Sequence, residues 1–343
     1  MMAIDMAAVR LAARKLEQGK LVAFPTETVY GLGGDAENAA AIADIYAAKG
    51  RPANHPVIVH IAPEADIAYW AAVVPAQAQL LIKAFWPGPL TLILKRAAHI
   101  PAAASGGQDS IGVRCPSHPV AQALLREFKN GQGGIAGPSA NKFGHVSPTT
   151  AQHVRDEFGD AGESLLDYIL DGGQSEVGIE STILDLSRVD THGVVLLRPG
   201  QISVDQIAAV LGMAPKAPDS AAPRASGTLD AHYAPHTPVA LVAAEQLSLL
   251  LPQLAVRGYR AALMQRLARV TDLADVMLMK TNPEHYAHDL YAALRTLDQC
   301  GADVILVEAL PNTSDWQGIN DRLRRAAFDS SGILARLLGH AGD

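Results

Sequence analysis

The chain of 343 residues has little of several features that would mark a specialised class of protein. It contains only two cysteines, Cys115 and Cys300, which lie far apart and form no CxxC pair. This scarcity excludes a disulfide-rich scaffold and a cysteine-based metal centre. No apolar run approaches the roughly 18 residues that a membrane-spanning helix needs. We therefore expect a cytoplasmic protein with no membrane partner.

Several sequence signals of function are absent as well. The segment Met1–Lys20 carries Asp5 and Glu17 and has no unbroken apolar stretch, so it does not resemble a signal peptide. The chain has no GxxxxGK[ST] phosphate loop, no GxGxxG opening a helix and no GxSxG nucleophile turn. Pro235 lies between His232 and His236, so these histidines do not form the helical pair of a zinc site. A nucleotide site, if present, must be built in another way.

Charge and aromatic content argue against general binding of nucleic acid. The formal net charge is −7, and aromatic residues make up only 5% of the chain. A protein that coats RNA is usually basic and offers aromatic rings on which bases stack. With 49% hydrophobic and 18% charged residues, the composition is that of a globular protein with a substantial core. Only a local basic pocket remains compatible with a nucleotide or nucleic-acid ligand.

Apolar runs and turn residues divide the chain into two α/β regions. Short apolar strands separated by helices and long Gly- and Pro-rich connections predict an α/β domain over residues 1–211. Residues 212–238 contain proline, alanine and serine without periodicity, which is typical of a linker. Over residues 239–343, strands alternate with helices, which predicts a small Rossmann-like domain with a parallel sheet.

The pair Lys49 and Arg51 is the first candidate for chemistry. A helix predicted over residues 39–48 ends there, and two cations flank Gly50. Lysine supplies a point charge and arginine a planar fork of donors, which suits phosphate or carboxylate. The same pattern also describes an ordinary helix end, because cations favour the helix C-terminus and glycine commonly caps it. Spacing alone leaves both interpretations open.

Other polar side chains follow predicted strands, where ligand sites of α/β folds often lie. Thr28 follows the strand predicted over residues 21–24, and His60 is a titratable residue inside an apolar strand. Arg114 and Arg198 each end a strand and could clamp an anion. Each of these residues also has a structural explanation, in turns, caps or the core, and none is specific alone. The same holds for Ser139 and Asn141 after a Gly-Pro turn.

Taken together and in order, the fragments resemble one family. They are PTETVYGLG (25–33), KGRPANHPVIVHI (49–61), FWPGPLT (85–91), GVRCPSHP (112–119), PSANKFGHVSPT (138–149), GIESTI (178–183) and LRPG (197–200). This series resembles the YrdC-type threonylcarbamoyl-AMP synthases. SGTLDAHYAP (226–235) resembles the interdomain linker of the long form of that family, and GINDRLRRAA (318–327) resembles the end of its C-terminal domain.

The resemblance implies a fold and a reaction. The fold is a twisted YrdC-like α/β sheet domain with a large concave cavity, followed by a small α/β domain. The reaction joins L-threonine, CO2 or bicarbonate, and ATP into threonylcarbamoyl-adenylate and releases pyrophosphate. Mg²⁺ is expected to accompany the ATP. The adenylate then passes to transferase machinery that makes N6-threonylcarbamoyladenosine in tRNA.

The resemblance also implies roles for individual residues. The residues implied to be catalytic, and to hold the triphosphate, are Lys49, Arg51, Ser139 and Asn141. Threonine would be held by Thr28, His60, Arg114, Ser139 and Ser181. ATP would be contacted by Lys49, Arg51, His55, Ser110, Asn141, Ser147, Arg198 and Tyr233. His55 stands where the family more commonly has asparagine, so this contact departs from the pattern. No residue is assigned as a metal ligand.

Two other functions are compatible with a basic cavity. One is an RNA-binding or ribosome-associated module without catalysis, which the acidic charge and the few aromatics disfavour. The other is carbamoyl transfer to another acceptor, as in related domains of hydrogenase-maturation proteins. The absence of zinc-binding Cys/His motifs disfavours this alternative. Release of pyrophosphate that depends on threonine separates the three.

Overall fold

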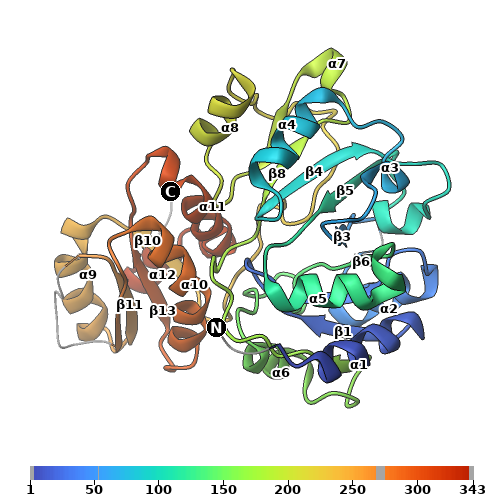
Figure 1. The fold of residues 1–343 in the computed structure, drawn as a ribbon. Coiled ribbons are helices and arrows are strands. Elements are labelled where there is room, and N and C mark those ends of the chain that lie inside the picture. Colours follow the sequence, from blue (N-terminus) through green and yellow to red (C-terminus); the bar gives the residue numbers. More distant parts are fainter. Residues whose placement is uncertain (1–3, 53, 268–274, 340–343) are drawn as a thin grey trace. The chain divides into compact units, whose positions relative to one another are not determined.

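The computed structural model describes residues 4–52, 54–267 and 275–339. These residues form two compact units (Figure 1). The first comprises Met1–Phe143 and Ser147–Thr228, and the second comprises Gly144–Val146 and Leu229–Asp343. Each unit has its own sheet, so the α/β character expected from the sequence is confirmed for both. None of the helices in the described ranges is long and apolar enough to cross a membrane.

The first unit is built on a mixed sheet in the order β7-β1-β2-β6-β3-β5-β4-β8-β9. Its strands are β1 (Leu21–Phe24), β2 (Gly31–Asp35), β3 (Ile58–Ile61), β4 (Leu90–Lys95), β5 (Ser110–Arg114), β6 (Gly134–Ala136), β7 (Leu166–Ile169), β8 (Thr182–Asp185) and β9 (Val195–Arg198). The strands β3 and β5 are parallel neighbours, whereas β4 runs antiparallel to β5. Both faces of the central strands β3 and β4 are buried, and these strands are therefore nearly continuous apolar runs in the sequence.

Helices cover this sheet. They are α1 (Met6–Glu17), α2 (Ala39–Lys49), α3 (Ile67–Trp70), α4 (Ala76–Phe85), α5 (Pro119–Glu127), α6 (Ala151–Phe158), α7 (Val189–His192) and α8 (Val204–Leu211), with short 3₁₀ turns η1 (Ala102–Ser105) and η2 (Phe128–Gly131). Asp5 and Asn38 begin α1 and α2 by accepting hydrogen bonds from the first free N–H groups of each helix. Helices α1 and α5 lie side by side and share a core with β1 (Figure 1).

Strand β2 is an element that the sequence patterns do not predict. Its sequence, GLGGD, has little intrinsic preference for a strand. Glycine is needed there because β1 approaches closely. A Cβ atom on Gly31 would lie 2.9 Å from the ring of Phe24, and one on Gly33 would lie 2.9 Å from the carbonyl oxygen of Val22. The close contact between the strands therefore selects residues that β-propensity rejects.

Residues 212–238, predicted as a linker, have an irregular structure without a helix or strand. The boundary between the two units lies within it, between Thr228 and Leu229. Upstream of this boundary the chain packs on the first unit: Lys216 bridges to Val195, and Ala225 is buried in a cluster with Ile58 and other apolar side chains. A composition poor in periodicity therefore marks an irregular but packed segment here.

The second unit is a parallel α/β fold, as the sequence predicts. Its sheet has the order β10-β13-β11-β12, and every neighbouring pair is parallel. The elements are β10 (Val239–Val242), α9 (Ala244–Val256), β11 (Ala261–Gln265), β12 (Asp275–Leu278), α10 (Pro283–Asp298), β13 (Val304–Glu308), η3 (Ser314–Trp316), α11 (Gln317–Ala326), η4 (Phe328–Ser330) and α12 (Ile333–Leu338). Helices α9 and α12 pack on each other and contribute to the core over β10, β11 and β13.

Candidate functional site

The pair Lys49 and Arg51 sits at the C-terminal end of α2. Gly50 caps this helix with φ of 64°, a left-handed conformation in which glycine carries no steric cost. The cap turns the chain so that both cations are drawn into the protein, where Lys49 is 3% and Arg51 7% exposed. The structural interpretation as a helix cap is therefore correct. It does not exclude a ligand role, because a surface helix end would leave these side chains in solvent.

Lys49 is held by the loop that carries Ser139 and Asn141. Its Nζ donates to the backbone oxygens of Ser139 at 2.5 Å and Asn141 at 2.6 Å. Two of the three ammonium donors are thereby used, and one remains for another acceptor. Burial, followed by the charge of Arg51, lowers the pKa of Lys49 well below its ordinary value. An anionic ligand would relieve this destabilisation of the charged form.

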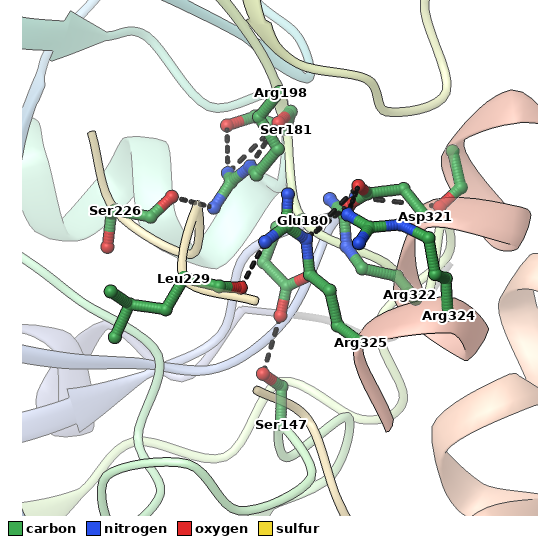
Figure 2. Close-up of polar contacts among 11 residues, drawn as sticks. Ser147, Glu180, Ser181, Arg198, Ser226, Leu229, Asp321, Arg322, Arg324 and Arg325 are labelled. Atoms are coloured by element: carbon green, nitrogen blue, oxygen red, sulfur yellow. Dashed lines mark hydrogen bonds and ion pairs between the residues drawn. The ribbon is translucent and has the colours of Figure 1, made fainter. Parts of the chain in front are cut away.

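A serine of the linker region connects the two arginines of the site. Arg51 Nη2 donates to Pro56 O at 2.7 Å and lies 3.3 Å from Ser226 Oγ, while Arg198 Nη1 donates to Ser226 O at 2.7 Å. Arg198 also donates from Nε and Nη2 to Ser181 O, at 3.1 and 2.9 Å (Figure 2). The structure thus joins Arg51 of the predicted phosphate set to Ser181 of the predicted threonine set.

Arg114 and Thr28 are brought into direct contact. Arg114 Nη1 donates to Thr28 Oγ1 at 2.9 Å, and both side chains are buried. His60 is the register partner of Arg114 across the parallel pair β3 and β5. Burial, with a further contribution from Arg114, lowers the pKa of His60 to about 3. The imidazole of His60 is therefore neutral near pH 7. Because its pKa is so low, it is a weak base and a poor candidate for a general base.

The other predicted ATP residues of the first unit, His55, Ser110 and Ser147, have separate local contacts. His55 packs edge-on against the ring of Phe143, and burial together with Arg51 lowers its pKa. Ser110 begins β5, opposite Lys95. Ser147 donates to a carboxylate oxygen of the buried Glu180 at 2.5 Å (Figure 2). No direct contact between His55 and Ser110 is recorded among the described residues, so their common role stays a prediction.

Tyr233 belongs to the second unit. Its backbone has a φ of 61°, which is uncommon for a residue other than glycine. The ring stacks on Tyr291 at 5.8 Å between centroids, and the guanidinium of Arg322 lies 5.3 Å from it. Within the same unit, Asp321 pairs with Arg322 and Arg325 (Figure 2). A role of Tyr233 in the ATP site stays a prediction.

Several polar residues that touch the predicted ones are not indicated by the sequence patterns; of these, Glu27 and Thr91 are buried and Ser226 is partly buried. Glu27 forms an ion pair with Arg114 at 2.6 Å. Thr91 Oγ1 lies 2.8 Å from Ser181 Oγ. Ser226 contacts both arginines. Glu27 and Ser226 lie inside the ordered fragments of the sequence, but no local pattern indicates the partners Arg114 and Arg51, which lie more than 80 positions away.

Among the described residues, no group of three or more His, Cys, Asp or Glu side chains is arranged to hold a metal ion. Any Mg²⁺ at this site would therefore need most of its ligands from phosphate oxygens and water, an arrangement that Mg²⁺ commonly adopts.

Comparison with known proteins gives matches over most of the chain. The profile of the Sua5/YciO/YrdC family, described as Telomere recombination, matches residues 14–200. The profile described as Threonylcarbamoyl-AMP synthase, C-terminal domain, matches residues 202–328. The threonylcarbamoyl-AMP synthase of Pyrococcus abyssi is 36% identical over 332 residues, which cover 93% of this chain and 94% of that protein. The enzyme of the same name from Bacillus subtilis is 37% identical, with 92% of each chain covered.

A solved structure gives the same result for the fold. The crystal structure of P. abyssi Sua5 complexed with L-threonine superimposes with a TM-score of 0.87 and 36% sequence identity. The match covers 95% of this chain and 96% of that one.

Proposed function

This chain belongs to the threonylcarbamoyl-AMP synthase family, the enzymes that make threonylcarbamoyl-adenylate, and we propose that it carries out this synthesis with the buried cationic and polar residues of its first unit. The observation that carries the proposal is the chain of contacts from Arg51 through Ser226 and Arg198 to Ser181. It joins a set of groups suited to phosphate with a set suited to an amino acid. L-threonine is the amino acid named in the complex of the P. abyssi relative.

The substrates would divide between the two sets. The remaining donor of Lys49 and the guanidinium of Arg51 would hold the triphosphate, with Ser139 and Asn141 shaping the loop beside it. Arg114, with Thr28 next to it, would receive the threonine carboxylate, because arginine binds carboxylates through two parallel N–H groups. His55, Ser110, Ser147, Arg198 and Tyr233 would contribute to the nucleotide site.

The reaction would then proceed in two steps. The unprotonated amine of threonine adds to the carbon of CO2, which gives a carbamate and releases one proton. A carbamate oxygen attacks the α-phosphorus of ATP in line, and the bond to the β-phosphate oxygen breaks, so that pyrophosphate leaves. The chain's part is positioning and charge neutralisation, as in other phosphoryl-type transfers. Because a pKa of about 3 makes His60 a weak base, it would orient the substrate rather than remove a proton at neutral pH.

Mg²⁺ would enter the site on the triphosphate and neutralise part of its charge. The described residues offer no ligand cage, so the cations of the first unit would share this task. The adenylate would pass to the transferase machinery that modifies tRNA. A cytoplasmic location stays a prediction from the sequence.

The test is release of pyrophosphate from ATP by the full chain, measured with and without L-threonine and bicarbonate. We expect release to require both. Lys49→Met is expected to remove most of it, whereas Lys83→Met is the matched control, because Lys83 also lies in the last turn of a helix but is exposed. Release that ignores threonine would defeat the proposed function. It would leave an RNA-binding module or a carbamoyl transfer to another acceptor as the alternatives.

A further inference from the structure

A buried carboxylate lies beside the arginine of the proposed threonine site. Glu27 is 2% exposed, and its Oε1 lies 2.6 Å from Nη2 of Arg114, which is 3% exposed. The contact is ionic rather than an aligned hydrogen bond, because Nη2 and both oxygens of Glu27 have no hydrogen-bond partner of good geometry. A buried polar group without such a partner destabilises the folded state. The pair is therefore an arrangement that stability alone does not favour.

The other contacts of Arg114 leave part of its guanidinium available. Nε donates to Gly88 O at 3.4 Å, and one N–H of Nη1 donates to Thr28 Oγ1 at 2.9 Å. Arginine has five N–H donors. Beside the ion pair of Nη2 with Glu27, one N–H of Nη1 and one of Nη2 therefore remain, which is enough for the parallel pair that a carboxylate accepts. Two separate segments hold the guanidinium, one with Gly88 and the other with Glu27 and Thr28, and Glu27 supplies the only charge of opposite sign in direct contact with it among the described residues.

We propose that Glu27 is a positioning residue of the threonine site, which holds the Arg114 guanidinium so that its remaining N–H groups face the carboxylate of the substrate. The inference rests on the proposed function, since it takes threonine as the ligand of Arg114. Glu27 does not touch the reacting atoms. It acts by fixing a long, flexible side chain in one orientation before the substrate arrives, which lowers the entropic cost of binding.

The groups around Glu27 are consistent with this role. The thiol of Cys115, next to Arg114, stays protonated, because burial and then Glu27 raise its pKa to about 12. Burial lowers the pKa of His118 despite the nearby charge of Glu27, so this imidazole is neutral at pH 7. Neither group therefore supplies a positive charge that would draw Glu27 away from Arg114.

The variant Glu27→Gln keeps the shape of the side chain and removes its charge. We expect the KM for threonine to rise roughly 10- to 100-fold, which is the effect of misplacing a binding group by about an ångström. The kcat and the KM for ATP are expected to stay within about threefold of wild type. Glu64→Gln is the matched control: it breaks the exposed ion pair of Glu64 with Arg126 and should change none of these constants.

A substrate analogue separates positioning from general damage. Threoninamide keeps the amine and the hydroxyl of threonine but has no carboxylate, so it gains nothing from an oriented Arg114. We expect Glu27→Gln to weaken inhibition by threoninamide much less than it weakens use of threonine. Equal weakening of both ligands would overturn the proposal, and so would an unchanged KM for threonine in the folded variant.

If Glu27→Gln does not fold, Glu27→Asp provides the same test with the charge retained on a shorter arm. An intermediate rise in the KM for threonine supports the proposal, and a wild-type value contradicts it. The outcome is distinct from failure of the proposed function, which would appear in the unaltered chain as pyrophosphate release that is independent of threonine.

Discussion

Replacement of Lys49 by methionine tests the phosphate set most severely, because the structure allows its effects on folding and catalysis to be weighed separately. The change removes two hydrogen bonds, from Nζ to Ser139 O and to Asn141 O. Hydrogen bonds to charged groups contribute about 1.5–3 kcal/mol each. Against this loss, the folded protein no longer has to bury an ammonium group, a penalty of several kcal/mol per ion in real proteins. We expect these contributions largely to cancel, leaving a folded protein.

Catalysis has no such compensation. A preorganised charged contact to a group that gains charge in the transition state is worth about 2.7–4 kcal/mol. Its loss slows the reaction roughly 10²- to 10³-fold. The assay is the rate of pyrophosphate release at saturating ATP and threonine, together with a thermal unfolding curve of the same preparation. Threonine binding without ATP should be unchanged. A folded Lys49→Met variant with turnover within about threefold of wild type would refute the assignment of Lys49 to the phosphates.

Three further predictions follow from other parts of the site. Ser226→Ala removes the hydroxyl near Arg51 but leaves the backbone contact to Arg198, so we expect a several-fold rise in the KM for ATP; no change would exclude a role for the hydroxyl. The pKa of His60 is lowered to about 3, below the ~6.5 of an unfolded histidine. Between these two pH values the unfolded chain binds more protons than the folded one, so the free energy of unfolding falls as pH drops from about 6.5 to about 3. His60→Gln should flatten the dependence of Tm on pH below about 6.5, and equal slopes would contradict the shift. Chelation of Mg²⁺ should abolish pyrophosphate release without affecting threonine binding to the free enzyme, and persistent release would exclude a metal requirement.

Much of the fold follows from local patterns in the sequence. The apolar run Leu21–Phe24 is β1, with the bounds that the residues predict. The helix predicted over residues 39–48 is α2, which extends one residue further. The alternation of strands and helices in the second unit correctly predicts a parallel sheet. Strand β2 could not be predicted, because its glycines are selected by contact with Phe24 rather than by strand propensity. Tertiary contacts also explain why the segment around Ala225 is packed although its composition suggests a linker.

The site could be predicted only in part, and for a related reason. From the sequence, Lys49 and Arg51 fit an ordinary helix end, and their burial is visible only in the structure. Before the structure, only the ordered fragments that resemble the family favour a phosphate site over a helix end. The importance of Glu27 depends on Arg114, far along the chain, so no local pattern indicates it. The sequence shows which polar residues are present. Which of them contact each other in the protein interior depends on the order of the strands in the sheet.

The most direct test of the account follows the carbon atom that joins the two substrates. The full chain is incubated with ATP, Mg²⁺, L-threonine and bicarbonate labelled with carbon-13, and the nucleotide products are analysed by mass spectrometry. The account predicts an adenylate that contains both threonine and the labelled carbon, formed in equal amount to pyrophosphate. Release of pyrophosphate with no labelled threonine adenylate would contradict it.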